Sequence, residues 1–417
     1  MVQQTQPRIR TYALDNLRTF LTVLVIFHHA ALAYGGTGSF GYRSPYHPPG
    51  SSISLTAFNV LNQTYFMGLF FLLSGYFSSI AAKKRSRMMF MKEKTKRLGM
   101  PTLIYSLFGK GTIRAIVAWR TTQASSDAIL GEFWQGIRST RGAGGPTWYT
   151  ASLLAMDALY TISRPTHFSS PKETTERSPL LSEQRATQLG ASPSSPSCGQ
   201  LKTSHVLLAL TLTGISSFVI RIFYPFGHTF VPLNLNLGYA PQYILYYCTG
   251  IFIQRRGITL EQPCHPRTIA LTGVMVAGMN VLGFVKVREV TQKRGTLRDV
   301  VKLAGGGFNI FALLYSLLNE FVGFMLTSLL LKVFHTPSLS KHWTILGIDL
   351  AKGSYAAFLV HIPVLVETMT LFDEEAWKEQ SPVLKTAIVG ALGTLKSWSL
   401  GLALKWVVEW FGWKGYL

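Results

Sequence analysis

Apolar residues occur along this 417-residue chain in long blocks that are separated by polar stretches. Most blocks approach the roughly 20 residues that a helix needs to cross a bilayer. They predict ten membrane-spanning helices, near residues 17–34, 55–82, 98–119, 148–163, 204–222, 236–254, 267–286, 308–333, 345–371 and 383–411. Lys110 and Arg114 interrupt the third block, and the fourth is short. The pattern predicts an all-α fold, a single polytopic membrane helix bundle of about ten transmembrane helices over residues 1–417.

A polar stretch interrupts this pattern at residues 164–203. Ser, Thr, Pro, Glu and Gln dominate it, and no apolar periodicity survives there. Such a composition buries too little apolar surface to offset the entropy of ordering the chain. Because apolar blocks continue on both sides, we predict a disordered cytosolic loop within one bundle rather than a boundary between domains.

The composition also favours a membrane protein. Only 14% of the residues are charged, whereas soluble domains carry about 25%. The net charge is +21, but the basic residues lie mostly between the apolar blocks, where they set topology beside anionic lipid. This distribution argues against nucleic-acid binding. The three cysteines, Cys198, Cys248 and Cys264, make no disulfide framework and match no metal-ligand spacing, so we expect no metal site.

The basic residues predict an orientation as well. The first loop holds only Arg43, whereas the loop after the second block is densely basic, with Lys83, Lys84, Arg85, Arg87, Lys92, Lys94, Lys96 and Arg97. Positively charged loops stay in the cytosol, so we predict a cytosolic N-terminus, and ten spans return the C-terminus there. Which membrane is involved stays open. Segment 286–307 disagrees, because it should lie outside yet carries six basic residues. Either it forms an interfacial element or a span is miscounted nearby.

Two ionisable residues of the first block, Arg18 and His29, are eleven positions apart. At about 100° and 1.5 Å per residue they share one helix face and lie about 16 Å apart. Ionisable groups inside a membrane are costly and mark functional sites. We predict that both line one buried tunnel, with Arg18 as a binding clamp near the cytosolic edge and His29 as a catalytic base near mid-depth. His28 points about 100° away, and we expect it to form a helix–helix hydrogen bond instead.

Two later spans also carry ionisable residues. His361 lies two positions before Pro363, which should distort the helix. This position fits a histidine that only packs beside the distortion and a functional histidine equally well. Glu320 is an isolated carboxylate among apolar residues, so it must pair or become protonated.

Polar and aromatic residues near span ends have a simpler interpretation. Arg221 is typical of an anchor that snorkels to the interface, and Trp148 of an interfacial aromatic. Lys96 and Arg97 end the basic second loop. Such a cluster either anchors the topology or holds a phosphorylated cofactor through charge-assisted contacts.

These segments, in this order, resemble the integral-membrane acyltransferase family 3. The matching pieces are residues 14–18 through His29, 70–77, 96–98 with Pro101, 148–149, 236–239 with 241–243, and 354–355 through His361 and Pro363. The resemblance covers nearly the whole chain except 164–203, and it is greatest to the glucan-succinylating branch and its fungal relatives. Many relatives have a histidine shortly before the tryptophan that matches Trp148, whereas this chain has Gly-Pro-Thr there.

The resemblance implies a membrane-bound O-acyltransferase, of the enzyme class that transfers groups other than aminoacyl groups. An acyl group, acetyl by default, would pass from a CoA thioester to a hydroxyl of a small metabolite, as in secondary metabolism, or of a glycan. Acyl-CoA would be a co-substrate, with no cofactor bound permanently. We assign catalysis to His29 and His361 and donor binding to Arg18, Arg97 and Lys96, and we expect Glu320, Trp148 and Arg221 to support the site.

A second class of function fits several of the same residues. Mid-depth histidines and a carboxylate also suit a proton-coupled transporter or exporter of a small metabolite, although the chain shows no internal repeat of the kind that transporters often have. A non-catalytic membrane scaffold is the third possibility. The sequence leaves open the acceptor, the acyl chain, direct transfer versus an acyl-enzyme, and the oligomeric state.

Overall fold

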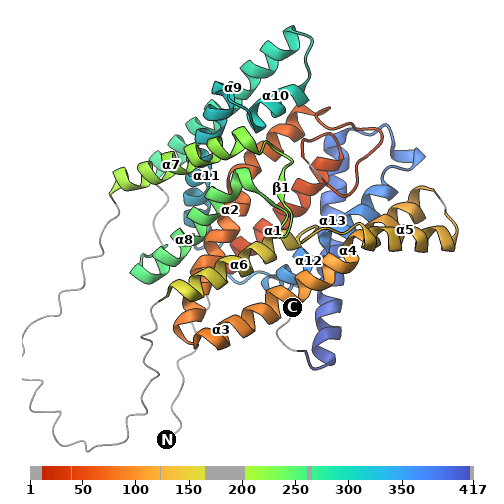
Figure 1. Ribbon diagram of the computed structural model, residues 1–417, viewed down its shortest axis with the longest axis horizontal. Coiled ribbons are helices and arrows are strands. Elements are labelled where there is room, and N and C mark those ends of the chain that lie inside the picture. The colour runs from red at the N-terminus through yellow and green to blue at the C-terminus, as the bar shows by residue number, and fades with distance from the viewer. Residues whose placement is uncertain (1–11, 39, 123, 165–201, 261–264, 414–417) are drawn as a thin grey trace, which may run out of the picture.

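The computed structural model describes residues 12–413, except 39, 123, 165–201 and 261–264, and it is a bundle of helices (Figure 1). The α-helices are α1 (Tyr12–Ala33), α2 (Ile53–Lys83), α3 (Arg87–Lys94), α4 (Met100–Thr121), α5 (Ser126–Arg138), α6 (Thr147–Ser163), α7 (Thr203–Phe223), α8 (Ala240–Arg256), α9 (Pro266–Gln292), α10 (Leu297–Gly305), α11 (Ile310–Phe334), α12 (Leu350–Leu371) and α13 (Pro382–Trp410). The predicted disordered loop lies outside the described residues, apart from Arg164 and residues 202–203.

Shorter elements join these helices. A π-helix (Thr95–Gly99) links α3 to α4, and 3-10 turns (Leu237–Tyr239 and Glu375–Trp377) precede α8 and α13. Two antiparallel pairs of very short strands form hairpins in loops: β1 (Thr229–Phe230) with β2 (Leu235–Asn236), and β3 (Thr344–Ile345) with β4 (Ile348–Asp349). The described chain is therefore helical wherever it crosses the bundle.

Fewer than ten of the described helices qualify as membrane spans by length and composition. Among the described residues, seven helices are long and apolar enough to cross a bilayer: α1, α2, α7, α9, α11, α12 and α13. The predicted spans 98–119, 148–163 and 236–254 are helices α4, α6 and α8, which do not reach this standard. α6 and α8 have only 17 residues each, and α4 carries Lys110 and Arg114. The count of ten is not confirmed, but the multi-pass membrane bundle is.

The bundle has two ends, which we name after residues of α1. At the Arg18 end, Asn16 Nδ2 donates to the carbonyl of Leu339, 2.7 Å away in the loop after α11. At the His29 end, Arg298 Nε of α10 donates to the carbonyl of Pro49 in the first loop, at 3.0 Å. Figure 1 shows α10 at one end of the molecule and α3 at the other.

Close helix contacts depend on small residues at two facing positions. A Cβ at Gly250 of α8 would lie 2.0 Å from the carbonyl oxygen of Leu72 in α2, and one at Gly75 of α2 would lie 2.1 Å from that of Tyr247 in α8. Glycine lets the two backbones meet at this distance, as small residues generally do at membrane helix interfaces. The α2–α8 pair forms one side of the core, and α1 packs between α2, α12 and α13.

Segment 286–307 adds no further span. α9 continues to Gln292, and α10 has nine residues, far fewer than a crossing needs. Leu297, Val300 and Ala304 of α10 face a cavity beside α9 and α11, whereas Arg298 and Lys302 lie on the other face. The segment therefore has the form of an interfacial element, which was the first of the two interpretations left open.

Candidate functional site

A pair of histidines joins α1 to α12 within the bundle. His29 Nδ1 and His361 Nε2 are 2.8 Å apart, and the two rings stack with centroids 5.0 Å apart and planes only 3° from parallel. His361 is fully buried, while His29 is half-buried beside the ring of Phe40. The two histidines, which the sequence places on separate spans, thus bring α1 and α12 into direct contact. No cluster of His, Cys, Asp or Glu suited to a metal occurs among the described residues.

A backbone carbonyl fixes the protons on both rings. His361 Nδ1 lies 2.5 Å from the carbonyl oxygen of Phe358. A carbonyl only accepts, so Nδ1 of His361 carries the proton, and in the neutral ring its Nε2 must accept. The proton between the rings then belongs to His29 Nδ1. Neutral His29 is left with a free electron pair on Nε2, for which the described part of the chain offers no hydrogen-bond partner.

The adjacent His28 has a different environment. It is buried, and Asn59 Nδ2 of α2 lies 3.2 Å from its Nδ1 and 3.1 Å from its carbonyl oxygen. The predicted helix–helix hydrogen bond of His28 is confirmed. His28 therefore connects α1 to α2, and His29 connects α1 to α12.

A cationic pocket of about 190 Å³ lies at the Arg18 end. Helices α1, α2, α6 and α12 meet there, and the end of α3 and the π-helix that follows it complete the wall. A π-helix is a distortion that often marks functional sites. Arg18, Lys94 and Arg97 line the pocket with Ser74, Tyr149 and Tyr355. The sequence prediction that Arg18 and Arg97 lie together is supported, whereas Lys96 is not among the lining residues.

Aromatic and polar contacts hold the pocket cations in place. Tyr355 donates its hydroxyl to the carbonyl of Arg97 at 2.8 Å, and the Arg97 guanidinium lies 5.6 Å from the centre of the Tyr355 ring. The Arg18 guanidinium lies 5.6 Å from the Phe77 ring and 3.9 Å from Asp15. These contacts orient the cations while leaving them at the pocket wall.

Lys94 belongs to a buried polar group that the sequence did not reveal. Its Nζ lies 2.9 Å from Asp157 of α6, which is fully buried. Tyr247 of α8 donates to the other oxygen of Asp157 at 2.6 Å. This ion pair between α3 and α6 joins the basic second loop to the bundle, so Lys94 is held by a specific partner.

Aromatic rings separate the pocket from the histidine pair. Phe358 lines the pocket together with Phe70 and Tyr149, and its ring centroid is 5.6 Å from that of His361. His29 and His361 are not lining residues of the pocket. The predicted continuous tunnel is therefore not seen. The Phe358 ring instead adjoins both regions, because it lines the pocket with Arg18 and lies beside His361, the partner of His29.

Arg221 and Glu320 lie in a buried cluster between α7, α8 and α11, away from the histidine pair. Arg221 is fully buried, so the interpretation as a snorkelling anchor is wrong. Its guanidinium lies 4.7 Å from the Tyr239 ring and donates to Ser316 Oγ at 2.9 Å. Glu320, one turn beyond Ser316 on α11, accepts a hydrogen bond from Asn319 at 2.9 Å, and it forms no salt bridge with any residue that the structure describes. This cluster between α7, α8 and α11 does not contact the histidine pair.

Trp148 packs beside residues of the pocket wall without lining the pocket. Its ring centroid is 5.6 Å from that of Tyr243 in α8 and 6.4 Å from that of Tyr149. Tyr149 in turn lies 2.7 Å from Ser74 Oγ through its hydroxyl and reaches the pocket wall. Trp148 thus fixes α6 against α8 rather than contacting the pocket itself.

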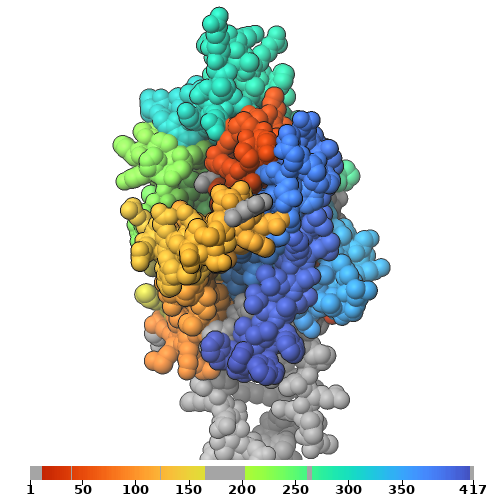
Figure 2. All heavy atoms as spheres, turned by 90° about the vertical axis from the view of Figure 1, so that its right-hand side faces the viewer, coloured from red at the N-terminus to blue at the C-terminus, as the bar shows by residue number. Residues whose placement is uncertain are grey.

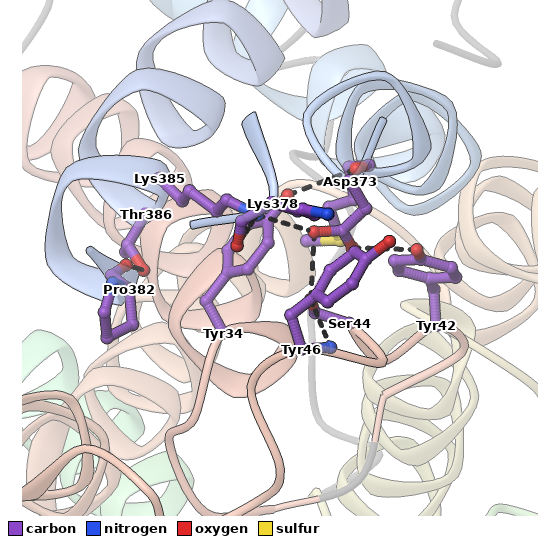
Figure 3. Close-up of polar contacts among 10 residues, drawn as sticks. Tyr34, Tyr42, Ser44, Tyr46, Asp373, Lys378, Pro382, Lys385 and Thr386 are labelled. Atoms are coloured by element: carbon purple, nitrogen blue, oxygen red, sulfur yellow. Dashed lines mark hydrogen bonds and ion pairs between the residues drawn. The ribbon is translucent and has the colours of Figure 1, made fainter. Parts of the chain in front are cut away.

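The first loop, residues 34–52, is fixed over the His29 end by a buried ion pair (Figure 3). Lys385 Nζ of α13 lies 2.9 Å from Asp373 Oδ1, and both side chains are almost fully buried. Tyr42 and Ser44 of the loop donate to the same carboxylate at 2.8 and 2.9 Å. Burial, followed by the Asp373 charge, raises the pKa of Tyr42 well above its usual value, so Tyr42 remains a donor.

Several site residues carry no recognisable signal in the sequence. Phe358 is one apolar residue within an apolar block, and only the fold shows that it separates the pocket from His361. Lys94 is one of eight basic residues in its loop, and only the contact with Asp157 distinguishes it. Tyr355 stands out in the sequence solely through the resemblance, which includes positions 354–355.

Comparisons with known proteins agree with this architecture. A family model described as an acyltransferase domain, acyltransferase family 3, matches residues 11–402. Glucans biosynthesis protein C of Escherichia coli (strain SMS-3-5 / SECEC) is 34% identical over 98 residues. That match spans 23% of this chain and 24% of the relative. No solved structure matches the chain significantly. Because the family model extends from α1 into α13 and includes both histidines and the cationic pocket, the chain belongs to acyltransferase family 3, a family of integral-membrane acyltransferases.

Proposed function

We propose that this protein transfers an acyl group from a CoA thioester to a hydroxyl group, with Nε2 of His29 as the base. The observation that carries the proposal is the oriented histidine pair. The Phe358 carbonyl and the 2.8 Å contact between the rings give His29 an unprotonated Nε2. Acyl transfer from a phosphorylated carrier needs a base for the acceptor hydroxyl and a site that binds the carrier. The unbonded Nε2 of His29 and the cationic pocket, on the same face of α1, can supply these two.

The pocket at the Arg18 end suits the donor. Arg18, Lys94 and Arg97 present positive charge at its wall, and guanidinium groups bind phosphate oxygens through paired hydrogen bonds. The phosphorylated end of CoA would lie here, and its long arm would pass the Phe358 ring towards His29. The roughly 16 Å between Arg18 and His29 along α1 suits an extended carrier better than a compact one. Phe358 must rotate aside to admit the arm.

The transfer step then needs only groups that are present. The acceptor hydroxyl gives its proton to His29 Nε2 while its oxygen attacks the thioester carbonyl carbon. The carbon–sulfur bond breaks, and the CoA sulfur leaves as a thiolate. His29 returns the proton to that sulfur, which regenerates the neutral ring. His361 accepts the hydrogen bond from His29 Nδ1 throughout and stabilises the imidazolium, in the way that a third group orients the base in other acyl-transfer enzymes.

The acceptor and the acyl group remain broader proposals. The printed name of the Escherichia coli relative concerns glucan biosynthesis, which supports a glycan hydroxyl, and a small-metabolite hydroxyl fits the same chemistry. We take acetyl as the acyl group to test first and succinyl as the second. The basic second loop lies at the Arg18 end, so we propose that this end, with both termini, faces the cytosol.

The experiment that tests the proposal compares product formation in cells. We expect mass spectrometry of glycans and metabolites to show acylated species in cells with the wild-type protein and none in cells with His29→Gln at equal expression. Purified wild-type protein should also release free CoA thiol from acetyl-CoA in an acceptor-dependent way, which a transporter would not do. Wild-type product levels in the His29→Gln cells would contradict the assigned base, and a covalently acylated His29 would contradict direct transfer.

A further inference from the structure

A second cavity lies between α2, α9, α10 and α11, away from the cationic pocket. Its volume is about 320 Å³, within the range of roughly 300–1,000 Å³ that holds small ligands. The walls are almost entirely apolar and include Val60, Leu61, Met279, Leu282 and Val300. Such a cavity suits a hydrocarbon chain.

One buried polar group points to a ligand rather than to an empty space. Thr56 of α2 lines the cavity and is only 5% exposed. Its Oγ1 has no hydrogen-bond partner within the part of the chain that the structure describes. A buried hydroxyl is normally satisfied, as that of Thr64 on the same helix is by the carbonyl of Leu61 at 2.8 Å. A ligand that carries an oxygen near the end of its chain would accept from Thr56.

The segment that contributes α10 to the cavity wall is strongly basic. Residues 286–305 contain six basic side chains and two acidic ones, Glu289 and Asp299, a balance of +4. Leu297, Val300 and Ala304 of α10 face the cavity, and Arg298 and Lys302 lie on the opposite, exposed side. The side chain of Lys302 is 79% exposed. In Figure 2 α9 and α10, coloured teal, form the top of the molecule.

The position of these cations needs an explanation. They lie at the His29 end, near Pro49 of the first loop, whereas the densely basic second loop lies at the Arg18 end. Loops at the two faces of a membrane normally differ in basic content, so basic segments at both ends are unusual. An amphipathic helix with a basic face, lying at the bilayer surface, binds anionic lipid.

We propose that this cavity binds one chain of a lipid with an anionic, phosphate-bearing headgroup. The chain fills the space between α2, α9 and α11, and the Thr56 hydroxyl donates to an ester oxygen. The headgroup lies at the bilayer surface beside α10, within the positive field of Arg298 and Lys302. The proposal does not depend on the proposed acyl transfer, because the cavity contacts neither His29 nor the cationic pocket.

Native mass spectrometry of the full-length protein in detergent tests the site. We expect phosphatidylglycerol to bind as a single adduct with a Kd at least about tenfold below that of phosphatidylcholine with the same chains, since two cations favour the anionic headgroup. Equal Kd values for the two lipids would overturn the proposal.

Two glycines of α9 provide a matched pair of variants. A Cβ at Gly283 or at Gly273 meets no other atom within 4 Å, so both sites tolerate a larger side chain. Only Gly283 lines the cavity. We expect Gly283→Leu to raise the Kd for phosphatidylglycerol at least about tenfold, and Gly273→Leu to leave it unchanged. Wild-type binding by Gly283→Leu would place the lipid elsewhere and overturn the cavity assignment.

Two further measurements test the contributions of the headgroup and of the chain to lipid binding separately. Arg298→Gln together with Lys302→Gln should remove most of the preference for phosphatidylglycerol over phosphatidylcholine, and an unchanged preference would contradict the role of α10. Excess inorganic phosphate should not displace the lipid. If phosphate displaces it, the site recognises a free anion, and the proposed role of the apolar cavity is wrong.

Discussion

The chemistry proposed for this protein depends on which nitrogen of each imidazole carries a proton. The carbonyl of Phe358 fixes the proton of His361, and His361 fixes that of His29. The sequence could place His29 on the Arg18 face because helix geometry is regular. It could not show that His361 meets His29, because that contact depends on how α1 and α12 pack.

If His361 positions His29, its substitution should lower kcat without changing donor binding. We expect His361→Ala to reduce kcat about ten- to hundredfold, as loss of an orienting partner commonly does, with the donor KM unchanged. His361→Gln, whose side-chain carbonyl can accept from His29 Nδ1, should recover part of that loss. Steady-state kinetics with purified protein measures both. Equal losses for the two variants would indicate a packing role only.

Arg18 should act on donor binding instead. We expect Arg18→Ala to raise the donor KM about ten- to hundredfold, because a hydrogen bond to a charged phosphate is lost. Arg18→Lys should lose affinity as well, since a single ammonium cannot replace a bidentate guanidinium. Lys92→Ala is the matched control, because Lys92 lies in the basic second loop near the pocket but does not line it. An unchanged donor KM in folded Arg18→Ala protein would refute the clamp.

At the scale of whole elements, the long apolar helices were predictable and the short amphipathic ones were not. α7 and α13 begin and end within a residue of the predicted spans 204–222 and 383–411, because each is one long apolar run. α5 was missed. It packs closely on α4, because a Cβ at Gly136 would lie only 2.4 Å from the Cα of Gly111. No pattern in the sequence predicts this contact.

The loop that closes the His29 end depends on the ion pair between α13 and the α12–α13 loop. Lys385→Met leaves the Asp373 carboxylate buried without its cation, and we expect a loss of about 3–5 kcal/mol in the free energy of unfolding. Lys396→Met removes the exposed partner of Glu367 and should cost at most about 1 kcal/mol. Denaturation in detergent, followed by intrinsic fluorescence, compares them. Similar losses would show that the first loop does not depend on this pair.

At the scale of the molecule, the two ends of the bundle differ. The pocket that we propose for the donor lies at the Arg18 end, and the first loop and α10 lie at the His29 end. The sequence indicated this polarity from its charges, but it left segment 286–307 unexplained. The structure shows that α10 is too short to cross and is amphipathic, so its charges reflect a surface position rather than a miscounted span.

This polarity can be tested by labelling. In a protein whose Cys198, Cys248 and Cys264 are replaced by serine, we introduce one cysteine by Lys92→Cys or by Lys302→Cys, both at exposed positions. We expect an impermeant maleimide to label only one of the two in sealed cells, and both after permeabilisation. Labelling of both from the same side would contradict the assignment of α3 and α10 to opposite faces of the membrane.

The most direct measurement of the central claim is single-turnover acyl transfer by two variants of adjacent residues. His29→Gln and His28→Gln change neighbouring histidines of α1, but only His29 has the uncommitted Nε2. With acyl-CoA binding measured separately and found equal, we expect His29→Gln to slow transfer about a hundredfold or more, while His28→Gln stays near the wild-type rate. Transfer by His29→Gln at the wild-type rate would show that another group removes the acceptor proton.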